Sequence, residues 1–111
     1  MSTSWMNQPQ EAGAEMSKIL IVDDSPSQLY YLRKMVEEVG HDAVTVESGE
    51  QALEAAANER PEVILMDIVM RGMSGYTAKR RLGKSQSTQH LPVIFFTSKD
   101  SVAVRAGGVG P

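Results

Sequence analysis

The sequence predicts an α/β domain built on a parallel sheet with helices on both faces. Three short runs, residues 19–22, 63–66 and 93–96, consist entirely of apolar residues. Such continuous runs are typical of strands that are covered on both sides, as the strands of parallel sheets are. The segments between these runs contain apolar residues at helical spacing, so strand and helix alternate along the chain.

A helix is predicted directly after the first strand. Ser25 is a suitable N-cap and Pro26 fits the first turn. Apolar residues then recur at helical spacing as far as Val39, and Gly40 suits the position just past the helix end. This segment therefore has a start signal, an amphipathic body and a stop signal.

The middle of the chain repeats the same alternation. Residues 43–46 predict a second, shorter strand. Ser48 can cap a second helix over residues 50–58, which has a modest apolar face, and Arg60 with Pro61 closes this helix.

The last part adds one more helix and strand. The third strand ends in Asp67, and a loop rich in Gly and Met follows it. Ser74 is the expected cap of a third helix over about residues 76–84. After a polar connection, the fourth strand ends at Thr97.

Composition limits the class of protein. A chain of 111 residues with 41% hydrophobic and 23% charged residues fits one globular domain, and we expect it to be residues 18–111 after a flexible polar leader, residues 1–17. The net charge of −3 gives no general attraction to nucleic acid or to an anionic membrane. Cysteine is absent, which excludes disulfides and thiolate metal sites, and no apolar run has transmembrane length. We expect a cytoplasmic protein.

Acidic residues follow two of the predicted strands. Asp23 and Asp24 come directly after the first strand and Asp67 ends the third, while the hydroxyl of Thr97 follows the fourth. Because the carboxyl ends of parallel strands meet at one edge of the sheet, these side chains should converge. A single aspartate there more often caps a helix, but three neighbouring carboxylates repel one another unless a cation lies among them. Oxygen ligands of this kind favour Mg²⁺.

The stretches "ILIVDDSPSQ", "PEVILMDIVMRGMSG" and "LPVIFFTSKD" resemble the receiver domain of bacterial two-component response regulators, the CheY-like family. Thr97 lies 30 residues after Asp67 (97 − 67), close to the spacing in that family between the phosphorylated aspartate and a hydroxyl residue. The resemblance extends over residues 18–100 and is greatest to single-domain regulators of twitching motility and type IV pili. It implies a flavodoxin-like, doubly wound parallel sheet with strand order 2-1-3-4.

The resemblance also implies a role for each site residue. Asp67 is the expected phosphoacceptor, which takes a phosphoryl group from a histidine kinase or a phosphotransfer protein. Asp24 is expected to bind Mg²⁺ directly and Asp23 largely through water, together with Asp67 and the backbone carbonyl of Val69. Thr97 is the expected switch hydroxyl, and a downstream protein is the expected target. We expect a signalling module and not an enzyme.

The chain departs from the family pattern after the fourth strand. The family continues with a fifth strand, a lysine that contacts the phosphoryl group, and a fifth helix, whereas this sequence ends at Pro111. Lys99 lies too close to Thr97 to be that lysine. We therefore expect the fourth strand to be an exposed sheet edge that favours self-association, in a domain of marginal stability.

The sequence also contains a group of basic residues after the third strand. Arg71 stands where the family commonly has proline, and we interpret it as a solvated loop charge. The basic residues of the third helix region predict an exposed face, with no direct binding of nucleic acid or membrane; they are Lys79, Arg80, Arg81 and Lys84. A phosphatase of the haloacid dehalogenase type needs a second aspartate two positions after its aspartate nucleophile. Here Asp24 is followed by Ser25 and Pro26, so this class of enzyme has little support. The main alternatives are a phosphate-independent interaction module and a defective fragment of a longer response regulator.

Overall fold

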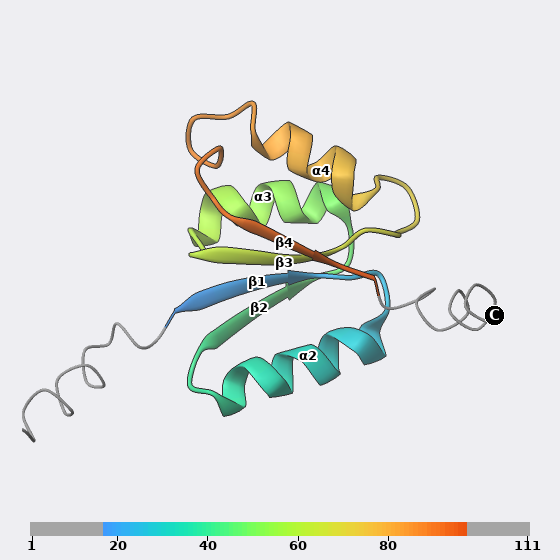
Figure 1. Ribbon diagram of the computed structural model, residues 1–111, viewed down its shortest axis with the longest axis vertical. Coiled ribbons are helices and arrows are strands. Elements are labelled where there is room, and N and C mark those ends of the chain that lie inside the picture. Colours follow the sequence, from blue (N-terminus) through green and yellow to red (C-terminus); the bar gives the residue numbers. More distant parts are fainter. Residues whose placement is uncertain (1–16, 98–111) are drawn as a thin grey trace, which may run out of the picture.

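Four short strands form a parallel sheet in the order β2, β1, β3, β4 (Figure 1). The computed structural model describes residues 17–97. Along the chain the elements are β1 (Lys18–Val22), α2 (Pro26–Glu38), β2 (Asp42–Val46), α3 (Gly49–Glu59), β3 (Val63–Asp67), α4 (Gly75–Leu82) and β4 (Val93–Phe96). The predicted fold class and strand order are confirmed.

A serine caps each of the three helices, as predicted. The hydroxyl of Ser25 accepts a hydrogen bond from the Gln28 amide at the start of α2 (3.3 Å). Ser48 caps α3 and Ser74 caps α4 in the same way. Their hydroxyls accept hydrogen bonds from the amides of Gln51 (3.1 Å) and Thr77 (3.2 Å). Each cap satisfies an amide that has no partner within its own helix.

The N-cap of α3 should contribute to the stability of the domain. We expect Ser48→Ala to lower the free energy of unfolding by about 1 kcal/mol, because the Gln51 amide loses its acceptor. Urea denaturation followed by circular dichroism measures this loss. Ser48→Asp keeps an acceptor at the cap and should retain most of the stability; an equal loss in both variants would contradict the capping role.

One helix boundary differs from the prediction. Helix α4 ends at Leu82 and not at Lys84. The carbonyl of Leu82 accepts a hydrogen bond from the buried hydroxyl of Thr88 (2.7 Å), which lies on the following turn. This contact satisfies a carbonyl at the helix end without a further helical turn.

Alternate residues of the strands build two apolar layers. On one face, Leu20, Val22, Ile64 and Met66 are fully buried beneath α3 and α4. On the opposite face, Ile21 packs against residues of α2. Figure 1 shows α2 alone on one side of the sheet and α3 with α4 on the other. Burial on both sides explains why the strands have no polar alternation.

Strand β4 forms one of the two edges of the described sheet. Its residues Val93 and Phe95 pack towards α3 and α4, whereas Ile94, on the other face, is 55% exposed. Within residues 17–97 no strand pairs with the outer edge of β4. Self-association through this edge stays a prediction.

Several expectations concern residues outside the described range. Residues 1–16 of the predicted leader and everything after Thr97, including Lys99 and Pro111, lie outside it. The division into leader and domain therefore stays a prediction. Among the helices that the structure describes, none is both long and apolar enough to cross a bilayer.

Candidate functional site

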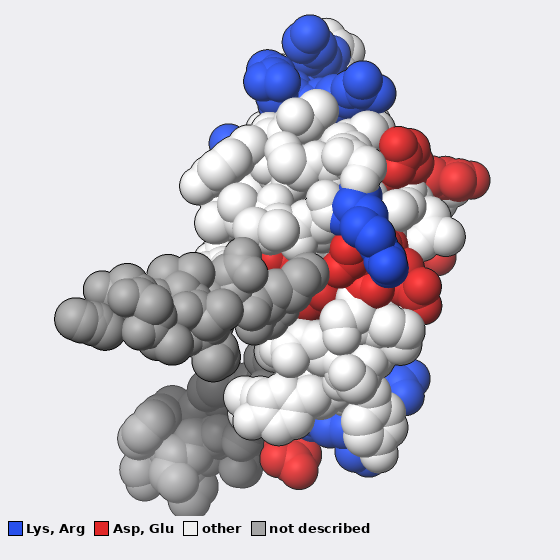
Figure 2. Space-filling view, turned by 90° about the vertical axis from the view of Figure 1, so that its right-hand side faces the viewer, with Lys and Arg blue, Asp and Glu red and all other residues white. Residues whose placement is uncertain are grey.

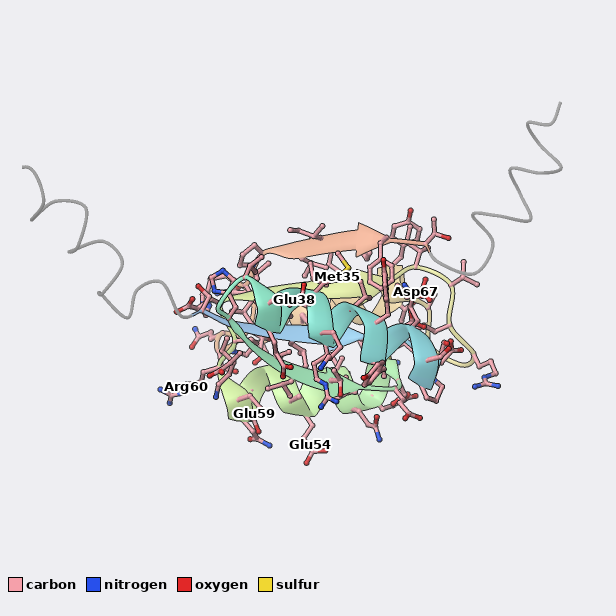
Figure 3. The ribbon with its side chains drawn as sticks, turned by 90° about the horizontal axis from the view of Figure 1, so that it is seen from below. Met35, Glu38, Glu54, Glu59, Arg60 and Asp67 are labelled. Atoms are coloured by element: carbon pink, nitrogen blue, oxygen red, sulfur yellow. The ribbon has the colours of Figure 1, made fainter. Side chains whose placement is uncertain are left out.

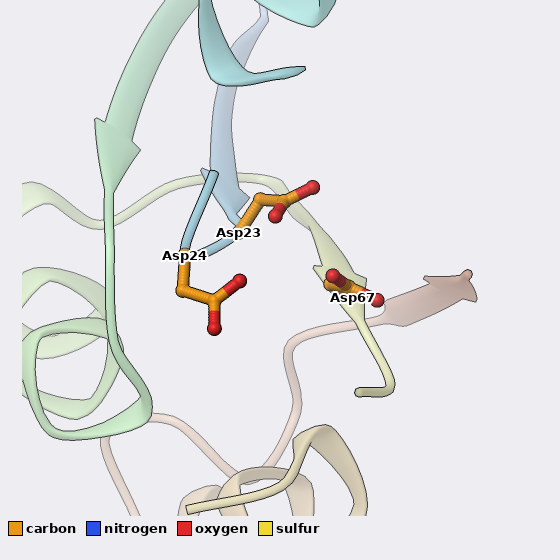
Figure 4. Close-up of side chains that lie close together, drawn as sticks. All are labelled: Asp23, Asp24 and Asp67. Carbon is orange, nitrogen blue, oxygen red and sulfur yellow. The ribbon is translucent and has the colours of Figure 1, made fainter. Parts of the chain in front are cut away.

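Three aspartates meet at the carboxyl edge of the sheet. Asp23 and Asp24 follow β1, and Asp67 ends the neighbouring strand β3 (Figure 4). The register of the two strands pairs Val22 with Met66, which brings the next residues, Asp23 and Asp67, level with each other. One carboxylate oxygen from each aspartate lies within 4.8 Å of the others. The predicted convergence of these side chains is confirmed.

The carboxylates lie in an unusual environment for acidic groups. Asp23 and Asp67 are fully buried, and the side chain of Asp24 is 10% exposed. Taking several like charges out of water into one site is costly unless cations or hydrogen-bond donors compensate. Figure 2 shows acidic atoms at the centre of this face, with basic atoms beside and above them.

Main-chain amides orient each carboxylate. The Ser25 amide donates to Oδ1 of Asp23 (3.0 Å), and the Val69 amide donates to Oδ1 of Asp67 (3.1 Å). Both contacts join residues two positions apart, so the turn after each strand holds its own aspartate. These hydrogen bonds fix the orientation of the two carboxylates.

The start of α4 lies against the end of β3. A Cβ atom added at Gly75 would meet the carbonyl oxygen of Asp67 and would lie 3.0 Å from Cα of Ile68. The Gly75 amide also donates to the Ile68 carbonyl (3.0 Å). Only glycine permits this close approach, so Gly75 helps to set the position of the Asp67 backbone. Sequence reasoning did not identify Gly75, because its spacing to Asp67 carries no local signal.

Arg71 contacts the site directly. Its amide donates to Oδ2 of Asp24 (2.9 Å), and its Nε atom lies 3.4 Å from the same oxygen. The Arg71 side chain is 85% exposed, as expected for a loop charge, but the interpretation of a merely solvated charge was incomplete because the residue is paired with Asp24. A proline at this position could not donate the amide hydrogen bond.

Two other predicted site residues lie nearby, with their roles untested. Thr97 directly follows Phe96, which is the register partner of Asp67, and Thr97 is exposed. Val69 contributes its amide to Asp67. The switch role of Thr97 and a metal contact by the Val69 carbonyl stay predictions.

The basic residues near the end of α4 are exposed, as predicted. Lys79, Arg80 and Arg81 lie in its last turn and Lys84 follows it. Figure 2 shows basic atoms gathered at the α4 side of the molecule, apart from the acidic centre. They do not belong to the carboxylate cluster.

The donor set defines what the site can bind. Three carboxylates from two adjacent strands offer only oxygen ligands, which are preferred by hard divalent cations such as Mg²⁺. Asp67 in addition presents a carboxylate beside this group that can act as a nucleophile. A parallel sheet with these features at its carboxyl edge defines the class of receiver domains.

Comparison with known proteins agrees with this class. Residues 19–110 match the family model of the response regulator receiver domain. The chain belongs to this family.

The curated relatives include proteins of similar size and several longer ones. The chain is 44% identical to protein PilH of Pseudomonas aeruginosa over 93 residues, which cover 84% of this chain and 77% of PilH. It is 39% identical over 92 residues to the transcriptional activator protein IrlR of Burkholderia pseudomallei, where the match covers 83% of this chain. The chain spans only 39% of the length of IrlR.

Solved structures of receiver domains have the same fold. The receiver domain of sensor histidine kinase PA1611 from Pseudomonas aeruginosa, solved with a magnesium ion coordinated in its active site cleft, is 28% identical with a TM-score of 0.71; the match covers 81% of this chain and 74% of that one. The complex of histidine kinase ThkA with response regulator protein TrrA contains a chain that is 30% identical with a TM-score of 0.68, covering 75% of this chain and 70% of that one.

Proposed function

We propose that this chain is a phosphoacceptor domain, which receives a phosphoryl group on Asp67 and signals through contacts with other proteins. The observation that carries the proposal is the cluster of one nearly buried and two fully buried aspartates within 4.8 Å of one another. Such a cluster is costly for folding and is therefore best explained by a function that uses its charge.

In the proposed reaction a carboxylate oxygen of Asp67 attacks the phosphorus of a phosphohistidine. A P–O bond forms while the P–N bond to the imidazole breaks, and the leaving nitrogen takes up a proton. The Val69 amide holds one oxygen of Asp67 at 3.1 Å and thereby limits the orientations of the nucleophile. The backbone of Asp67 is held in turn by the contact with Gly75.

The residues fit a bound Mg²⁺. Asp23, Asp24 and Asp67 would hold the ion, and when bound it supplies positive charge to the phosphoryl oxygens. The magnesium ion in the cleft of the PA1611 receiver domain supports this choice of metal. We include the Val69 carbonyl as a further ligand and Thr97 as the hydroxyl that responds to phosphorylation.

The proposed partners follow from the same function. The similarity to the chain in the ThkA and TrrA complex supports a sensor histidine kinase as a partner, and a phosphotransfer protein is chemically equivalent as a donor. The 44% identity to PilH supports a role in pilus motility. We propose that the domain acts in the cytoplasm, as a protein that others modify and bind and not as an enzyme.

Phosphate uptake tests the proposal. The chain is incubated with a small acyl-phosphate donor and Mg²⁺, and its mass is measured by intact mass spectrometry. We expect the mass to increase by one phosphoryl group. In a parallel incubation with a chelator, which removes the metal, we expect no increase. A chain that is folded by circular dichroism and takes up no phosphate would contradict the proposal and favour a phosphate-independent binding module.

The contact of Arg71 with Asp24 leads to a prediction about metal affinity. Because the guanidinium lies beside an expected metal ligand, it repels a divalent cation. We expect Arg71→Gln to raise the Mg²⁺ affinity about two- to fivefold at low salt, the scale of an exposed ion pair. Isothermal titration calorimetry measures this change.

Arg80→Gln is the matched control, because it removes the same charge from α4 and leaves the contact with Asp24 in place. Its effect on Mg²⁺ affinity should be smaller. The difference between the two variants should shrink at high ionic strength, since salt screens exposed charges. Weaker binding of Mg²⁺ by Arg71→Gln would show that Arg71 supports the metal site.

A further inference from the structure

A pocket lies at the end of the sheet opposite to the aspartates. It is a pocket of about 580 Å³, which we call the basal pocket. Its apolar wall consists of Ala56 and Ala57 near the end of α3, Pro61 before β3, and Leu91 with Pro92 before β4. Figure 3 shows Arg60, which also lines this pocket, and Asp67 at opposite ends of the sheet. The volume lies within the range of pockets that hold small molecules or large side chains.

The lining predicts the chemistry of the occupant. Small alanines leave room above α3, and the rings of Pro61 and Pro92 offer flat apolar surfaces. The polar lining consists of Arg60, Glu62, Ser87 and His90. An aromatic group with one hydrogen-bond donor fits this set, because its ring can pack on the prolines and its donor can reach a carboxylate, a hydroxyl or an imidazole.

The sequence carries such a group in the segment before β1. Trp5 is the only tryptophan of the sequence and lies in residues 1–16, outside the described structure. An indole combines a large apolar ring with a single N–H donor. A guanidinium such as that of Arg60 also interacts favourably with the face of an indole.

The segment that carries Trp5 joins the domain beside the pocket wall. The carbonyl of Lys18 accepts a hydrogen bond from the Glu62 amide (2.8 Å), and Nζ of Lys18 lies 3.2 Å from the Glu59 carbonyl. These contacts hold the first residue of β1 against the segment 59–62, which contains Arg60 and Pro61. The leader thus enters the described fold at the end of the sheet that carries the basal pocket.

The length of the leader permits docking. Trp5 lies twelve positions before Ser17 (17 − 5), and a stretch of this length can span up to roughly 40 Å when extended. It can therefore reach a pocket beside Lys18 with slack to spare.

We propose that the basal pocket is an intramolecular docking site for the indole of Trp5. The ring lies against Ala57, Pro61 and Pro92, and the rest of the leader serves as a tether. The pocket is remote from Asp67, so the proposal does not depend on phosphorylation or on metal binding.

Tryptophan fluorescence tests this directly, because the single tryptophan reports on its own environment. We expect the intact chain to emit at a shorter wavelength than the urea-unfolded chain. The efficiency of acrylamide quenching should be lower in the intact chain by a factor of about two or more, because a packed indole is shielded from solvent. Ala57→Leu fills the pocket and should shift the emission towards that of the unfolded chain. Asn58→Leu is the matched control, since Asn58 is the adjacent exposed residue of α3 and does not line the pocket.

The remaining outcomes overturn the proposal. Equal emission and quenching in the native and unfolded chains would show that Trp5 is not docked, and this comparison needs no variant. A protected indole that Ala57→Leu leaves protected, in a chain that circular dichroism shows to be folded, would place it elsewhere. Protection that disappears on dilution would show that Trp5 binds a second copy and not its own chain.

Discussion

We expect the Asp67→Asn variant to take up no phosphate from an acyl-phosphate donor in the presence of Mg²⁺. The amide that replaces the carboxylate has nearly the same shape but lacks the charged oxygen that attacks phosphorus. The Val69 amide retains an oxygen acceptor at this position, so the local turn need not change. Intact mass spectrometry of the wild-type and variant chains under identical conditions measures the loss.

Asp42→Asn is the matched control for this experiment. Asp42 is an exposed aspartate at the start of β2, whereas the site lies at the carboxyl ends of the strands. The variant should therefore take up phosphate as the wild-type chain does. Undiminished uptake by Asp67→Asn would assign the phosphate to another residue. Urea denaturation of both variants separates a loss of chemistry from a loss of fold.

Gly75→Ala is expected to have the largest effect on stability among the substitutions considered. The new methyl group would meet the Asp67 carbonyl oxygen and the Ile68 Cα atom, which are backbone atoms that cannot rotate away. Either α4 or the end of β3 must shift, at a cost of about 1–3 kcal/mol, as in other overpacked positions. Because the shift moves the Asp67 backbone, phosphate uptake should fall as well.

Gly83→Ala provides the control for Gly75→Ala. Gly83 follows the last residue of α4 and has a φ of −71°. A Cβ atom added at Gly83 would lie 3.4 Å from its nearest neighbour, the carbonyl oxygen of Arg80. An alanine is accommodated there and should change the free energy of unfolding by less than about 1 kcal/mol. Chemical denaturation of both variants gives the comparison, and an equal loss of stability would refute the close contact at Gly75.

The order of the elements could be predicted because its signals are local. The apolar runs, the capping serines and the stop at Gly40 depend on residues within a few positions of one another. The convergence of the three aspartates could be predicted as well. Each lies at the carboxyl end of a strand, and parallel strands have their carboxyl ends at the same side of the sheet. The predicted end of α4 was wrong by two residues because it depends on Thr88, which lies six residues beyond Leu82 in a loop without a regular pattern.

The fold class and the members of the acidic cluster follow from the amino-acid sequence, and the family resemblance implies the strand order. Three features depend instead on the folded arrangement: the pairing of Arg71 with Asp24, the close approach of Gly75 to Asp67, and the basal pocket between α3 and the segment before β4. Arg71 and Asp24 are 47 residues apart, and the pocket joins segments about 30 residues apart. Such contacts depend on how the helices pack on the sheet, whereas periodicity and capping are properties of each segment alone.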